Sequence, residues 1–163
     1  MAQYRNNEDQ TKKILKENKY MVLATSDKNS TPWANPVFYS NDEEYNFYFL
    51  SAIDSRHAEN IIVNPKISAA IFDSTQKIGS SEGIQIEGSV SIVKRTELEK
   101  VIKLYSDKLF PTSKLSGPER YNPSDYDEPS EFRFFKITPK KVYITGVDRR
   151  AEVSLVNKEG FTP

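Results

Sequence analysis

Strand-like runs follow one another along this chain, and helical patterns interrupt them instead of alternating with them. The runs, rich in aromatic and β-branched residues, are YMVLATS (20–26), PVFYS (36–40), YNFYFLS (45–51), ISAAIFD (67–73), IQIEGSVSIV (84–93) and EFRFFKITPKKVYIT (131–145). The residues NDEE between the second and third runs predict a hairpin. Strands in direct succession predict an α+β fold with an antiparallel sheet or barrel, and argue against a parallel doubly wound sheet.

Two positions inside these runs predict a local break in strand geometry. Gly88 interrupts the alternation of apolar and polar residues in the fifth run, which indicates a bend or a bulge. Pro139 lies within the last run, so that run is either two strands or one strand bent at the proline.

Helical patterns occupy the spaces between the strands. The first covers residues 6–19, the second opens at Ser55 and stops before Asn64 and Pro65, and the third covers residues 96–110. Thr96 and Glu99 have the spacing of a capping box at the start of the third helix. The residues expected to face the core are Ile14 and Leu15, then Ala58, Ile61 and Ile62, then Leu98, Val101, Ile102, Tyr105 and Leu109.

The chain of 163 residues is expected to form a single domain, residues 1–163. Residues 111–130 are rich in Pro, Ser, Gly and Tyr and predict a long loop, and residues 151–163 predict a C-terminal tail. Tyr121 and Tyr126 either cover a bound ligand or anchor this loop, and anchoring is the favoured interpretation.

Composition removes several classes of function. The 23 basic and 23 acidic residues give a formal net charge of zero, so no overall attraction to nucleic acid or to an anionic membrane is expected. The chain has no cysteine and one histidine, which argues against disulfides, thiolate chemistry and a metal site. No apolar run is long enough to span a membrane and the N-terminus is too polar for a signal peptide, so a cytoplasmic location is expected.

The stretch FLSAIDSRHAENIIVNP (49–65) combines a strand, an abrupt helix start and two basic residues. Arg56 and His57 fall in the first helical turn, where cations oppose the positive end of the helix dipole. A bound anion would explain them, because a helix N-terminus offers free N–H groups and an adjacent arginine can bind phosphate through two hydrogen bonds. Alternatively, Arg56 pairs with Asp54 or Glu59 and His57 faces water.

The segments YMVLAT, PWANPVFY, FYFLSAIDSRHAENIIVNPKISAAIF and GIQIEG, in this order, resemble the FMN-binding split-barrel family, whose best-known member is pyridoxamine 5′-phosphate oxidase. The resemblance covers roughly residues 20–93, with weaker agreement over 132–145. It implies a split β-barrel that forms a homodimer with FMN sites at the subunit interface.

The resemblance also implies which residues hold the cofactor. Ser55, Arg56 and His57 fall on the family's phosphate-binding triplet, and Gln85 falls on a glutamine that faces the cofactor. The full set of implied FMN-binding residues is Asn35, Pro36, Val37, Phe38, Leu50, Ser51, Ser55, Arg56, His57 and Gln85. Catalytic residues stay unassigned. The resemblance also implies that the strand containing residues 35–38 lies along the flavin ring, and we call it the flavin strand. Trp33 precedes it, and core or dimer packing is its favoured role over flavin contact.

Departures from the oxidase narrow the expected activity. His57 stands in place of a lysine, Asn35 in place of an arginine and Ser40 in place of a substrate-binding lysine, and the oxidase's C-terminal tryptophan and arginines have no counterpart. The sequence therefore predicts an FMN-binding oxidoreductase that acts on a small-molecule redox substrate, with NAD(P)H as a candidate donor, and not pyridoxamine phosphate oxidation. The alternatives are a flavin carrier or sensor without turnover, and the same fold holding deazaflavin or haem.

Overall fold

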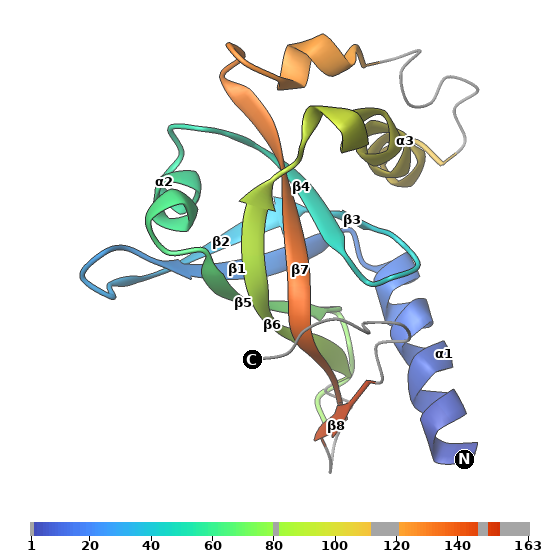
Figure 1. Ribbon diagram of the computed structural model, residues 1–163. Coiled ribbons are helices and arrows are strands. Elements are labelled where there is room, and N and C mark those ends of the chain that lie inside the picture. The colour runs from blue at the N-terminus through green and yellow to red at the C-terminus, as the bar shows by residue number, and fades with distance from the viewer. Residues whose placement is uncertain (1, 80–81, 112–120, 147–149, 154–163) are drawn as a thin grey trace.

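The computed structural model describes residues 2–79, 82–111, 121–146 and 150–153 (Figure 1). An eight-stranded antiparallel sheet runs in the order β2-β1-β5-β6-β7-β4-β3, with β8 paired to β7. The strands are β1 Tyr20–Ser26, β2 Pro32–Phe38, β3 Ser40–Asn41, β4 Phe47–Ala52, β5 Lys66–Phe72, β6 Gly83–Ile92, β7 Phe132–Thr145 and β8 Arg150–Glu152. The sheet curls, so that β1 and β2 cross behind β6 and β7 in Figure 1. This half-barrel confirms the predicted α+β split-barrel fold.

Helices cover the open sides of the curled sheet (Figure 1). They are α1 Ala2–Glu17, α2 Arg56–Val63 and α3 Leu98–Leu109, with short 3₁₀ turns η1 Arg95–Glu97 and η3 Pro123–Tyr126. Ile14 and Leu15 of α1 are buried in the main core, as predicted. Ile62 of α2 is 60% exposed, which corrects the prediction that it faces the core. The eight-residue helix turns Ala58 and Ile61 inward, and Ile62 follows on the solvent side.

The predicted capping box at the third helix is wrong. Thr96 lies in the 3₁₀ turn η1 and is exposed, and α3 starts after Glu97, whose side chain makes no capping hydrogen bond. The helix is held instead by its apolar stripe, because Leu98, Val101 and Ile102 are buried in a second cluster on the outer side of β4. Tyr121 and Tyr126 pack on the same cluster, which favours the anchoring role.

The predicted hairpin between residues 36–40 and 45–51 is only partly correct. Pro36 to Phe38 belong to β2, which pairs along its whole length with β1, and only Ser40 and Asn41 pair with β4. The carboxylate of Asp42 closes the tight turn by accepting hydrogen bonds from the backbone N–H groups of Glu44 and Asn46. The strand therefore changes partner at Tyr39, a fully buried core residue that sequence patterning alone did not distinguish from its neighbours.

Gly88 and Pro139 form the predicted irregularity together. They face each other across β6 and β7, at the point where the register shifts between Glu87 and Gly88. A Cβ at Gly88 would lie 2.5 Å from the backbone oxygen of Thr138, so only glycine fits this close approach. The last run is therefore one bent strand. β8 was not predicted; it includes Ala151 and Glu152 from the expected tail, whereas residues 154–163 and residues 112–120 of the expected loop lie outside the described parts.

Candidate functional site

The start of α2 is built directly on the end of β4. Ser55 has extended dihedral angles (φ −70°, ψ 145°) and caps the helix by accepting a hydrogen bond from the N–H of Ala58 at 3.4 Å. Its hydroxyl also donates to the carbonyl of Ala52 at 2.8 Å, which fixes the serine to the strand end. The abrupt strand-to-helix junction predicted from the sequence is confirmed, with the helix N–H groups of the first turn at its tip.

Two serines hold the only histidine. Nε2 of His57 lies 2.7 Å from Oγ of Ser51 and 3.3 Å from Oγ of Ser55, and the two hydroxyl oxygens lie 3.0 Å apart. His57 is only 8% exposed and packs beside the ring of Phe49, so the alternative in which it faces water is wrong. Burial lowers the pKa of His57 below its ordinary value, which favours the neutral imidazole at pH 7.

Arg56 is exposed and lies against an aromatic ring. Its guanidinium carbon is 4.2 Å from the ring centroid of Trp33, close enough for a cation–π contact. Among the described residues no carboxylate lies within 4.0 Å of this guanidinium, so the expected alternative of a pair with Asp54 or Glu59 is not formed. Trp33 is itself 37% exposed, and its contact is with Arg56 instead of a closed core.

The flavin strand implied by the resemblance presents alternate residues to two faces. Asn35 and Val37 pair with Leu23 and Met21 on the face of the main core. Pro36 and Phe38 lie on the outer face, where Phe38 contacts the rings of Tyr20 and Tyr105. Leu50 packs on the second cluster, so its side chain faces away from its neighbour Ser51.

Gln85 lies apart from the α2 site in a single chain. Its neighbours Ile84 and Ile86 are buried, whereas Gln85 is exposed on the outer face. The strand register connects Gln85 through Ala70 and Val22 to Pro36. Three strand spacings of about 4.8 Å separate the ends of this row by roughly 14 Å along the sheet.

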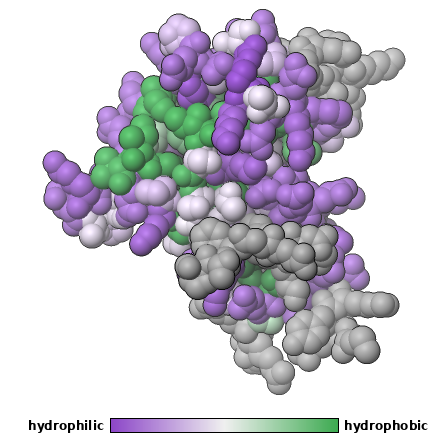
Figure 2. Space-filling model, viewed as in Figure 1, coloured by the Kyte–Doolittle hydropathy of each residue, from purple (hydrophilic) through white to green (hydrophobic). Residues whose placement is uncertain are grey.

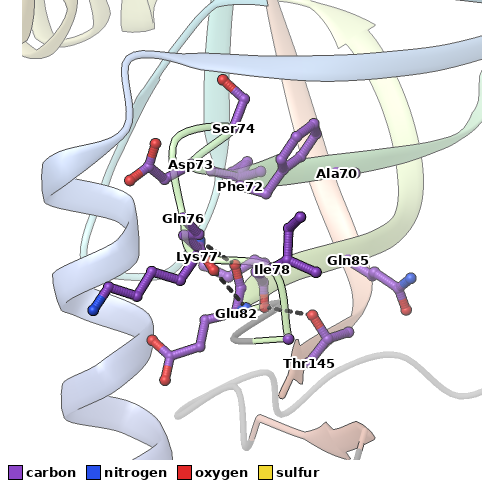
Figure 3. A pocket seen from close by; sticks show the side chains of 14 residues that line it. Ala70, Phe72, Asp73, Ser74, Gln76, Lys77, Ile78, Glu82, Gln85 and Thr145 are labelled. Atoms are coloured by element: carbon purple, nitrogen blue, oxygen red, sulfur yellow. Dashed lines mark hydrogen bonds between the residues drawn. The ribbon is translucent and has the colours of Figure 1, made fainter. Parts of the chain in front are cut away.

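A hollow of about 510 Å³ adjoins Gln85, lined mainly by residues of β5, β6 and the connection between them. Figure 3 shows Gln85 on the opposite side of this hollow from Lys77. The side-chain amide of Gln76 holds the connection by two 2.8 Å hydrogen bonds to the backbone N–H and C=O of Glu82. Of the predicted site residues, Gln85 thus lies at this hollow, Ser51, Ser55, Arg56 and His57 lie at the start of α2, and residues 35–38 lie along β2.

One residue beside the α2 site was missed by the sequence reasoning. Arg133 of β7 pairs directly with Ser51 of β4 and is only 8% exposed. The signal in the sequence is an arginine inside the aromatic run EFRFF, where the alternating pattern demands an inward residue.

Within the described parts of the chain, no group of three or more metal-ligating side chains is assembled. The helices of these parts are also too short or too polar to cross a bilayer.

The fold places the chain among split-barrel proteins. It resembles a haem-binding protein from Mycobacterium smegmatis, with a TM-score of 0.70 and 18% identity over 91% of this chain and 57% of that chain. It also resembles a putative pyridoxamine 5′-phosphate oxidase from Listeria innocua, with a TM-score of 0.60 and 19% identity over 84% of this chain and 96% of that chain.

The family model of pyridoxamine 5′-phosphate oxidase matches residues 8–146, and the chain belongs to this family. Among curated relatives, the UPF0306 protein PM1958 of Pasteurella multocida is 29% identical over 87 residues. That match covers 53% of this chain and 58% of the relative, so the chain spans little more than half the relative's length.

Proposed function

We propose that this protein binds FMN at the start of α2 and works as an FMN-dependent oxidoreductase on a small-molecule substrate, with NAD(P)H as the first donor to test. The observation that carries the proposal is Arg56, an exposed guanidinium beside the helix-capping Ser55. Among the described residues it forms no ion pair within 4.0 Å, and it acts on the carboxylate of Asp27 only from a longer distance. A phosphate monoester supplies the missing anion and matches the fork of an arginine.

The residues at this site supply both neutral and charged hydrogen-bond donors for phosphate. The first-turn N–H groups of α2 donate neutral hydrogen bonds and Arg56 donates charged ones, whereas the Ser55 hydroxyl already donates its hydrogen to the carbonyl of Ala52. Burial lowers the pKa of His57, and its Nε2 orients Ser51 through the 2.7 Å hydrogen bond. Bound FMN would supply the hydride or electron transfer, and the protein would bind and orient it.

We further propose that a second copy of the chain completes the site. Gln85 lies on the outer face, whereas Ser51 and His57 lie toward the core, so one chain does not present both to one flavin. The outer face also exposes Tyr20 (61%) and Phe72 (51%), and α2 exposes Ile62 and Val63, where apolar side chains gather in Figure 2. Exposed apolar surface of this kind supports a homodimer.

Haem is the competing ligand, because the structural neighbours include two haem proteins, the haem-binding protein from Mycobacterium smegmatis and the haem storage protein HutZ from Vibrio cholerae. The only histidine argues against it as an axial ligand, since its Nε2 already bonds Ser51 in a buried position. A flavin carrier without turnover is the competing function for the same ligand.

Absorption spectra of the purified chain, titrated separately with FMN and with haem, test the proposal. Saturable FMN binding, followed by bleaching of the flavin band when NADH or NADPH is added without oxygen, would support an oxidoreductase. An FMN complex that no donor reduces would favour the carrier. A Soret band with saturable haem binding and no FMN binding would refute the proposal.

A further inference from the structure

Arg133 is a buried cation next to the α2 site. It lies on β7 directly opposite Ser51 of β4, and paired residues of adjacent strands point to the same face, with Cβ atoms about 5 Å apart. Ser51 in turn bonds Ser55 and His57. One strand spacing therefore separates Arg133 from Ser51, which in turn contacts the capping Ser55.

Hydrogen bonds turn the Arg133 side chain toward that end of the sheet. Its Nη1 donates to the backbone carbonyls of Ser130 and Phe132, which both precede it on the chain. At the same end, the N–H of Ile53 donates to the carbonyl of Glu131 at 2.8 Å, which ties β7 to the junction that leads into α2. The guanidinium is thus anchored where β4 gives way to the helix.

The charge of Arg133 is uncompensated in the described structure. Among the described residues no carboxylate lies within 4.0 Å of its guanidinium, although only 8% of the residue is exposed. A buried charge is costly unless it is paired, and two carbonyl acceptors satisfy hydrogen bonds without neutralising the cation. The other edge of the planar guanidinium can still donate to an anion.

We propose that Arg133 is a second arginine of the phosphate site, which contacts the phosphate monoester from the side of Ser51 while Arg56 contacts it from solvent. The inference rests on the proposed FMN function and extends it to a residue outside the motif formed by Ser55, Arg56 and His57 (the SRH motif). The site would then be selective for a dianionic phosphate over an uncharged ligand, because two guanidinium groups would contact the phosphate, neither of them in an ion pair within 4.0 Å among the described residues. The alternative is that Arg133 only closes the turn at residues 130–132.

The test compares Arg133→Met and Arg133→Lys with the unchanged protein, using FMN, riboflavin and inorganic phosphate as probes. Arg133→Met should weaken FMN binding by about 10- to 100-fold and leave riboflavin binding within about twofold, since riboflavin lacks the phosphate. Phosphate should compete with FMN less effectively in this variant. Arg133→Lys keeps the charge and should lose less affinity for FMN. It provides a second measurement if the methionine variant does not fold.

Arg95→Met serves as the control, because Arg95 is an exposed arginine paired with Asp127 at 3.7 Å. Equal losses of affinity for FMN and for riboflavin, or an unchanged affinity for FMN, would overturn the role of Arg133. If Arg56→Ala then still lost FMN selectively, the proposed FMN function would stand without Arg133. An unchanged protein that binds no FMN would overturn both.

Discussion

The imidazole Nε2 of His57 and the hydroxyl of Ser51 lie 2.7 Å apart at a buried position, on adjoining ends of a helix and a strand. This contact makes the second basic residue of the SRH motif an internal group. Arg56 is then the exposed cation of the motif, and the two residues are expected to respond differently to pH.

Stability should depend on pH through His57. Burial lowers the pKa of His57 in the folded protein below its value in the unfolded chain. The unfolded chain therefore binds more protons as the pH falls through about 6.5. The stabilisation is therefore complete above that pH and decreases toward pH 5. Urea unfolding at pH 5, 6, 7 and 8 should show this decrease, and His57→Gln should flatten it. An identical pH profile for both proteins would show that another group is responsible.

Arg56→Ala should weaken FMN binding by about 30- to 1000-fold, because a bidentate arginine contributes charged hydrogen bonds to the phosphate even when partly exposed. Fluorescence titration of FMN measures the loss. Arg95→Ala is the matched control, since its guanidinium is also exposed but faces Asp127. Similar losses for the two variants would remove Arg56 from the site.

Gly88→Ala should destabilise the fold by about 1–3 kcal/mol, because the new Cβ would meet backbone atoms that cannot rotate away. The nearest are the Thr138 oxygen at 2.5 Å and the Pro139 Cα at 2.9 Å. Urea unfolding provides the measurement. The neighbouring exposed Ser89→Ala should change stability by no more than about 0.5 kcal/mol, and a similarly small effect of Gly88→Ala would contradict the close approach.

A shared site predicts complementation between two defective variants. Arg56→Ala and Gln85→Ala should each weaken FMN binding, and a mixed dimer should contain one site with both native residues. Co-refolding equal amounts should therefore recover a tight-binding fraction of about one site in four if subunits pair at random. Light scattering should give twice the 18.7 kDa chain mass. A monomer, or no recovery on mixing, would place both residues outside a shared site.

The sequence patterns were sufficient for an antiparallel sheet or barrel and for the strand-to-helix junction, because these depend on local alternation, on turn residues and on the serine that opens the helix. The split barrel itself was implied by the resemblance to the FMN-binding split-barrel family. The sequence was insufficient for features that tertiary contacts determine. The change of strand partner at Tyr39 depends on which neighbour completes β1, and the cap of α3 was replaced by packing against the second cluster.

The site was predicted unevenly for the same reason. Ser55 and His57 were expected as phosphate contacts and Ser51 as a further cofactor-binding residue, but their mutual hydrogen bonds require the three-dimensional junction. Arg133 is distant from them in sequence and reaches them only through the pairing of β4 with β7.

The dissociation constants of FMN and riboflavin, measured under identical conditions on the unchanged protein, test the central claim most directly. The two ligands share the ring system and differ at the phosphate, so their ratio isolates the anion site at the start of α2. The account predicts that FMN binds at least about 100-fold more tightly, given charged hydrogen bonds from arginine. Equal affinities, or no binding of either flavin, would contradict it.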